Sequence, residues 1–193
     1  MNLKGDLMSF FSRISRKIEE VNTGKAAPQE LSDELYLNES KAEEIWHDMQ
    51  PNLVSNVVKA VDDSVERAFI FVDFSGDATI ETFFQVDGEI VSWEQLTNSR
   101  YVDKIQNQLM VQAQDIADYV NGLFKQEGRS KIKYAELQYE AASGAWFSHT
   151  IYEGADGSEI SREKILSGWY DLLKTEVPKY ALDSDEKLPW FPN

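Results

Sequence analysis

The run Ala68-Phe-Ile-Phe-Val-Asp-Phe74, together with the segment Thr79 to Trp93 that follows it, decides the fold of this chain. The run is short and rich in aromatic and β-branched residues, which is typical of a buried strand. Thr79 to Val86 alternates as a strand with one buried side, and Asp87-Gly88 predicts a two-residue turn because both positions tolerate positive φ. Glu89 to Trp93 is therefore expected to return as a third, antiparallel strand.

A long helix and a second hairpin are predicted next. Apolar residues recur at helical spacing from a cap near Ser99 to Gly128, a residue that suits a helix terminus. Lys133 to Ala141 and Ala145 to Tyr152 are two alternating strands joined around Ser143-Gly144. The stripe of the long helix consists of Val102, Ile105, Leu109, Ala113, Ile116, Val120 and Leu123.

Helices are also predicted before and after this central part. One begins near Asn38 to Ser40 and reaches Val61, with a break or kink expected just before Pro51. The last is capped by Ser161 and ended by Pro178. Hairpins grouped between helices indicate an α+β fold: a mainly antiparallel sheet of about five strands, with a long helix packed on it and the helices on one face.

The chain divides into three predicted regions. Residues 1–38 form an amphipathic helix and a linker, 39–180 a single α+β domain, and 181–193 an acidic and aromatic tail. The N-terminal helix is expected to dock on protein, either on the rest of the chain or as a homodimer contact; a membrane-surface helix is the weaker alternative. Its stripe comprises Leu3, Leu7, Phe10, Ile14, Ile18 and Val21.

Composition restricts the partners. The chain carries 34 acidic and 19 basic residues, a formal net charge of -15. Such a charge repels phosphate backbones and anionic membranes and attracts basic proteins, although acidic surfaces also serve solubility alone. No apolar run is long enough to span a bilayer, no secretory signal opens the chain, and there is no cysteine, so we expect a cytoplasmic location.

The residue inventory offers little catalytic chemistry. His47 and His149 are the only histidines, and each lies in a pattern typical of a structural residue. Neither adjoins a nucleophile motif, two distant histidines without cysteine do not make a zinc site, and no glycine-rich phosphate loop is present. Acidic pairs such as Asp62-Asp63 are interpreted as solvated faces and turns. We therefore expect no catalysis, no cofactor and no metal.

Exposed carboxylates near the first hairpin are the candidate partner-binding residues. Turn chemistry explains Asp77 and Asp87 equally well. Trp190 and Phe191, between two prolines near the end of the chain, either fold back on the domain or anchor a partner. The acidic candidates are Asp62, Asp63, Asp73, Asp77, Asp87 and Glu89.

Several stretches carry a likeness to a known family: Glu66 to Phe74, Thr82 to Val86, Glu89 to Trp93, Leu123 to Gly128, Tyr134 to Glu140, Phe147 and Trp169. With these stretches in this order, the chain from Ala42 to about Lys174 resembles the YezG-like immunity proteins, small acidic bacterial proteins that neutralise a toxin. The first 40 residues lie outside it. The resemblance implies an antitoxin without catalysis of its own, whose acidic face masks a basic toxin such as a nuclease. Two alternatives remain open: an adaptor or regulatory module unrelated to toxins, and a weak hydrolase that uses carboxylates alone.

Overall fold

The computed structural model describes residues 40–61, 65–96, 102–155, 158–176 and 187–190, and all of them belong to one compact unit. The predicted N-terminal helix and linker, the cap near Ser99 and the stop at Pro178 lie outside these residues. The described elements, in chain order, are α2 (Lys41–Ala60), β1 (Arg67–Asp73), β2 (Thr79–Val86), β3 (Glu89–Ser92), the 3-10 helix η1 (Trp93–Gln95), α3 (Val102–Gln126), β4 (Ile132–Glu140), β5 (Trp146–Tyr152) and α4 (Arg162–Glu176).

The strands form one antiparallel sheet in the order β3-β2-β1-β4-β5. β1 lies at its centre, and every one of its residues is buried. A strand that is apolar along nearly its whole length can be buried on both faces, which is why this run takes the central place. The predicted α+β class, with a five-stranded antiparallel sheet and a long helix packed on it, is confirmed.

The turn signals act as predicted. Asp87 and Gly88 have φ values of 52° and 78°, which a two-residue turn with a right-handed twist requires. β3 ends one residue earlier than expected, because the Ser92 N–H donates to Gln95 Oε1 at 2.9 Å and starts η1. Trp93 then packs edge-on against Phe84, with ring centroids 4.8 Å apart.

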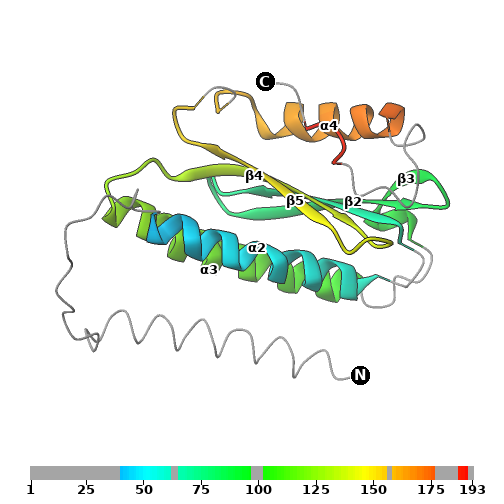
Figure 1. The fold of residues 1–193 in the computed structure, drawn as a ribbon, viewed down its shortest axis with the longest axis horizontal. Helices are drawn as coiled ribbons and strands as arrows, with labels where there is room; N and C mark the ends of the chain where they lie inside the picture. The colour runs from blue at the N-terminus through cyan, green and yellow to red at the C-terminus, as the bar shows by residue number, and fades with distance from the viewer. Residues whose placement is uncertain (1–39, 62–64, 97–101, 156–157, 177–186, 191–193) are drawn as a thin grey trace. The chain divides into compact units, whose positions relative to one another are not determined.

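The helices cover both faces of the sheet, so the expectation of helices on one face is wrong. Figure 1 shows α2 and α3 below the sheet and α4 above it. Phe69 and Phe71 of β1 belong to the core cluster that contains Trp169 of α4, whereas the ring of Phe74 pairs with Trp46 of α2. Since successive residues of a strand point to opposite faces, a doubly apolar β1 needs a helix on each side.

α2 runs without interruption through Pro51, so of the predicted break or kink the break is wrong. Proline lacks the N–H that would bond to the carbonyl four residues earlier, which weakens a helix interior. Pro51 lies on the exposed side of α2, however, and the buried face continues on both sides of it through Trp46, Met49, Leu53, Val54 and Val57. This packing outweighs the missing hydrogen bond. None of the helices in the described ranges is both long and apolar enough to cross a bilayer.

Candidate interaction surface

The acidic candidates do not form one patch. Asp77, Asp87 and Glu89 are exposed, but Asp77 precedes β2 and the other two follow it. An eight-residue strand is about 26 Å long, so these carboxylates lie at opposite ends of the sheet. Asp62 and Asp63 lie outside the described residues. The structure therefore divides the candidates into two groups.

The first group surrounds the β2–β3 turn. Besides Asp87 and Glu89 it includes Glu66, whose Oε2 accepts a hydrogen bond from the Gly88 N–H at 3.0 Å. Glu66 comes just before β1 and is brought to the turn by the antiparallel pairing of β1 with β2. Glu66 is not among the carboxylates predicted from the sequence, although the pairing of two predicted neighbouring strands places it at this turn.

The second group surrounds the turn that contains Asp77. The next residue, Ala78, donates its N–H to Gln114 Oε1 at 2.8 Å, and Gln114 Nε2 donates to Asp118 Oδ1 at 3.0 Å. This relay places exposed carboxylates of α3 beside the turn: Asp118, with Asp115 less than one helical turn away. The apolar stripe of α3 predicts both on its outer side, but only the fold brings that side to Asp77.

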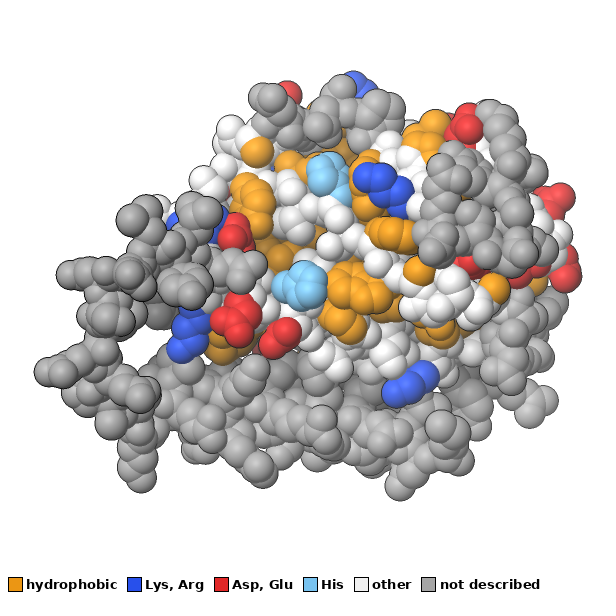
Figure 2. Space-filling view, in the orientation of Figure 1, with side chains coloured by type: hydrophobic (Ala, Val, Ile, Leu, Met, Phe, Trp, Pro, Cys, Tyr) orange, Lys and Arg blue, Asp and Glu red, His pale blue; other side chains and the backbone are white. Residues whose placement is uncertain are grey.

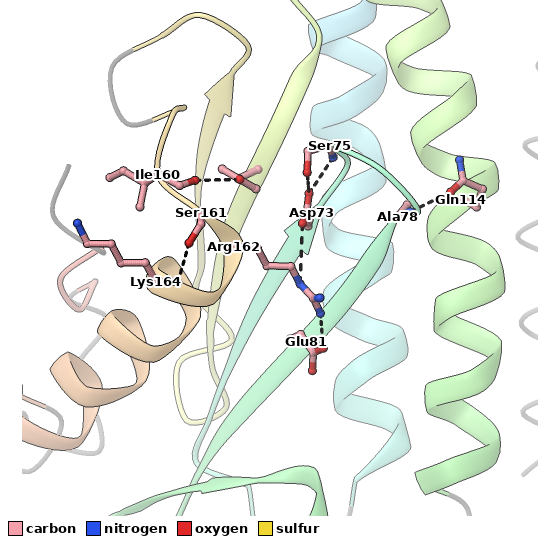
Figure 3. Close-up of polar contacts among 10 residues, drawn as sticks. Asp73, Ser75, Ala78, Glu81, Gln114, Ile160, Ser161, Arg162 and Lys164 are labelled. Carbon is pink, nitrogen blue, oxygen red and sulfur yellow. Dashed lines mark hydrogen bonds and ion pairs between the residues drawn. The ribbon is translucent and has the colours of Figure 1, made fainter.

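Asp73 does not belong to an exposed acidic surface, so its place among the exposed carboxylates is wrong. It is 5% exposed, and its Oδ1 accepts hydrogen bonds from the Ser75 N–H at 2.7 Å and Oγ at 2.6 Å. Arg162 at the start of α4 reaches down to it, with Nε 3.8 Å from Asp73 Oδ2 and Nη2 2.6 Å from Glu81 Oε1 (Figure 3). The last residue of β1 faces α4, which explains its burial.

A second surface, which we call the β5 edge surface, has a different character. It consists of Trp146, Phe147 and His149 of β5, His47 of α2 and Trp190 of the tail, none of which is buried. Ring centroids are 5.5 Å apart for His47 and Trp146 and 5.6 Å apart for His149 and Trp190. Figure 2 shows both histidines on one face, with hydrophobic side chains near them and carboxylates to one side.

The tail is predicted either to fold back on the domain or to anchor a partner, and Trp190 folds back on the domain. Besides its contact with His149, its ring lies 6.4 Å from that of Trp169 in α4. It is partly exposed, so it both covers the core and contributes to the surface. Phe191 lies outside the described residues.

His149 makes the one histidine–carboxylate contact found in the described part of the chain. Its Nδ1 lies 3.2 Å from Glu136 Oε2, and Glu136 is completely buried on β4. A carboxylate that orients an imidazole is half of a catalytic arrangement, which also needs a nucleophile within reach. No hydroxyl in the described ranges hydrogen-bonds to this ring, and these ranges contain no group of three potential metal ligands among His, Asp and Glu.

Tyr152, the last residue of β5, is partly buried and lies near Glu43 and Arg129. Burial raises the pKa of Tyr152, the nearby Glu43 carboxylate raises it further, and Arg129 opposes both. Arg129 also pairs with Glu43, with Nη2 2.5 Å from Oε1. This contact ties the end of α3 to the start of α2 beside the end of the edge strand.

Comparison with protein-family models and with curated proteins gives no match to this chain.

Proposed function

We propose that this chain is a non-catalytic immunity protein, which binds a basic protein toxin and neutralises it by covering its active surface. The observation that carries the proposal is the excess of carboxylates: a net charge of -15, with exposed acidic groups at both ends of the sheet. Immunity of this kind requires a stable fold and a complementary surface and no chemistry of its own.

The two acidic groups suit this role because they are on the rim of the domain. A summed negative field attracts a basic partner over long range and raises its association rate. Glu66, which is hydrogen-bonded to the turn, and the Gln114 relay hold the two turns in place. Side chains on fixed turns lose less conformational freedom when a partner binds.

The first experiment identifies the partner. The native chain is purified from its own cells, and the proteins that accompany it are identified by mass spectrometry. The proposal expects a basic protein whose production stops growth, and growth should return when the chain is produced with it.

Two outcomes contradict the proposal in different ways. A captured basic protein that is harmless to the cell would favour the adaptor or regulatory module. For such a module no toxin gene is expected beside the gene of this chain. Binding whose association rate does not fall as salt rises would rule out recognition through an acidic surface, because exposed charges are screened beyond about 8 Å at physiological ionic strength.

A further inference from the structure

β5 is an edge strand with an open side. In the described ranges it pairs with β4 alone. The Glu140 N–H donates to Ala145 O at 2.9 Å, so these opposite residues form a hydrogen-bonded pair. Hydrogen-bonded and non-bonded pairs alternate along antiparallel strands. The backbone groups of Trp146, Ser148 and Thr150 therefore point away from β4, toward the open side.

The strand β5 itself lacks the sequence features that usually protect an edge. Edge strands tend to be short or to carry charged residues, proline or bulges, which prevent pairing with another chain. β5 is seven residues long, and its sequence, Trp-Phe-Ser-His-Thr-Ile-Tyr, contains no lysine, arginine, carboxylate or proline. Its one register irregularity, between Ile132 and Tyr134 of the partner strand, is at the far end. The other edge strand, β3, has only four residues.

The two sides of the open edge differ in chemistry. On the side of α4 the strand presents Phe147 and His149, with Trp190 beside them. On the side of α2 lies His47 next to Trp146, and Glu44 and Asp48 share the exposed face of that helix with His47. One side therefore suits apolar side chains and the other suits cations.

We propose that the open edge of β5 accepts an extended segment of the basic partner as a sixth strand. Backbone hydrogen bonds to Trp146, Ser148 and Thr150 supply the pairing, and alternate side chains of the segment meet the two sides of the edge. The segment carries basic residues toward Glu44 and Asp48 and apolar residues toward Phe147 and Trp190. This site rests on the proposed function, because it assumes a basic protein partner.

Charge favours such a partner over a second copy of this chain. Two copies, each with a net charge of -15, repel each other, and pairing of two β5 edges would bring the carboxylates of both α2 helices together. A basic segment is attracted by the same groups.

The test uses the full chain and a synthetic peptide of eight residues that alternates lysine and valine, with both ends blocked. A peptide of equal composition with four valines before four lysines is the control, since it has the same charge without the alternation. We expect the alternating peptide to bind at least about tenfold more tightly. On binding, hydrogen exchange should slow at the amides of Trp146, Ser148 and Thr150, and not at Phe147 and His149, which already face β4. Equal affinity of the two peptides contradicts the site.

The variant Ser148→Pro removes one outward N–H and leaves the β4–β5 hydrogen bonds in place. It should lower the affinity for the alternating peptide by at least about tenfold, whereas the matched control Ser148→Ala, which keeps the N–H, should not. If Ser148→Pro does not fold, the native chain is tested with two further alternating peptides, one N-methylated on all its lysines and the other on all its valines. In strand addition the N–H groups of only one of these two residue types face β5, so only one of the two peptides should lose its affinity. Equal affinity of the two peptides overturns the site.

The remaining outcomes separate this site from the function on which it rests. A chain that dimerises alone, and that Ser148→Pro turns into a monomer, would show that a second copy occupies the edge and overturn the proposal. A captured basic partner that binds Ser148→Pro as tightly as the native chain overturns the edge site and leaves the proposed function standing. If the native chain captures no basic protein, the proposed function fails, whatever the peptides do.

Discussion

Gln138 and Leu188 exchange two buried hydrogen bonds: Gln138 Nε2 donates to the Leu188 carbonyl at 2.9 Å, and the Leu188 N–H donates to Gln138 Oε1 at 2.8 Å. An amide side chain thus pairs with the backbone of a tail 50 residues away as a neighbouring strand would. Trp169 Nε1 adds a bond to Pro189 O at 3.2 Å. These contacts hold Trp190 against His149, on the surface where we place the partner.

Replacing Gln138 with leucine should therefore release the tail. The backbone N–H and C=O of Leu188 would lose their partners in a buried place, which costs about 1–3 kcal/mol of the free energy of unfolding. Urea unfolding measures the loss, and tryptophan fluorescence should report that Trp190 has left His149. The same substitution at the exposed Gln126 of α3 is the control and should change stability by less than about 0.5 kcal/mol. Equal losses at the two sites would mean that the tail is not held by this pair.

α3 supplies a second, internally matched pair of variants. Ile116 is 4% exposed and Val111 is 70% exposed on the same helix. Ile116→Ala leaves a cavity and should cost about 2–5 kcal/mol of the free energy of unfolding, and Val111→Ala should cost less than about 0.5 kcal/mol. Chemical denaturation of both variants tests this. Similar costs would show that α3 does not use its Ile116 face to cover the sheet.

The start of α2 depends on a residue from the end of α3. The Ala42 N–H donates to Glu127 Oε1 at 3.0 Å, and the Ser40 hydroxyl donates to Glu127 Oε2. Glu127→Ala leaves these donors to water and should lower the free energy of unfolding by about 1 kcal/mol. Urea unfolding monitored by circular dichroism is the measurement, and Gln126→Ala is the neighbouring control. An unchanged midpoint in Glu127→Ala would show that α2 is capped without it.

Because the pKa of Tyr152 is raised in the folded chain, we expect the protein to lose stability at high pH. Folding raises the pKa of its phenol above the ordinary value of 10.0, chiefly through burial. The neutral phenol is thus favoured in the folded state, so this contribution is complete below about pH 10 and falls as the pH rises through the folded pKa. When the pH is raised and tyrosinate absorbance is followed, Tyr152→Phe should show one tyrosine fewer than the native chain among those that ionise above the ordinary pKa. Arg129→Gln should move that transition to still higher pH, because Arg129 lowers the pKa; a shift to lower pH would contradict the assignment.

The two acidic groups can be told apart by equal changes of charge. Asp87→Lys with Glu89→Lys reverses one group, and Asp77→Lys with Asp118→Lys reverses the other. Both pairs change the net charge equally, so a difference between them reflects the local contact and not the overall field. Surface plasmon resonance with the captured partner should show a slower association for the pair nearer the contact, with a weaker dependence on salt. If neither pair slows association, recognition does not use these carboxylates.

Local signals in the sequence predict most of the elements. Ser161 accepts from the Lys164 N–H at 3.4 Å at the start of α4. Gly128, with a φ of 68°, closes α3, where the Arg129 N–H donates to Phe124 O at 2.9 Å. Such caps and turns involve residues that are neighbours along the chain, so the sequence shows both partners at once. Pro51 is the exception, because packing on the far side of α2 outweighs its local preference.

The sequence by itself therefore determined the five strands, the helices α2, α3 and α4, and the acidic excess, since each depends on spacing within a short window or on composition alone. Only the tertiary structure decided that α4 covers the second face, that Asp73 is buried under Arg162, and that Gln138 holds the tail at Leu188. It also decided that β5 is at the edge of the sheet. These features join residues distant in the chain, and which distant residues meet depends on the packing of the whole core, which no local pattern records.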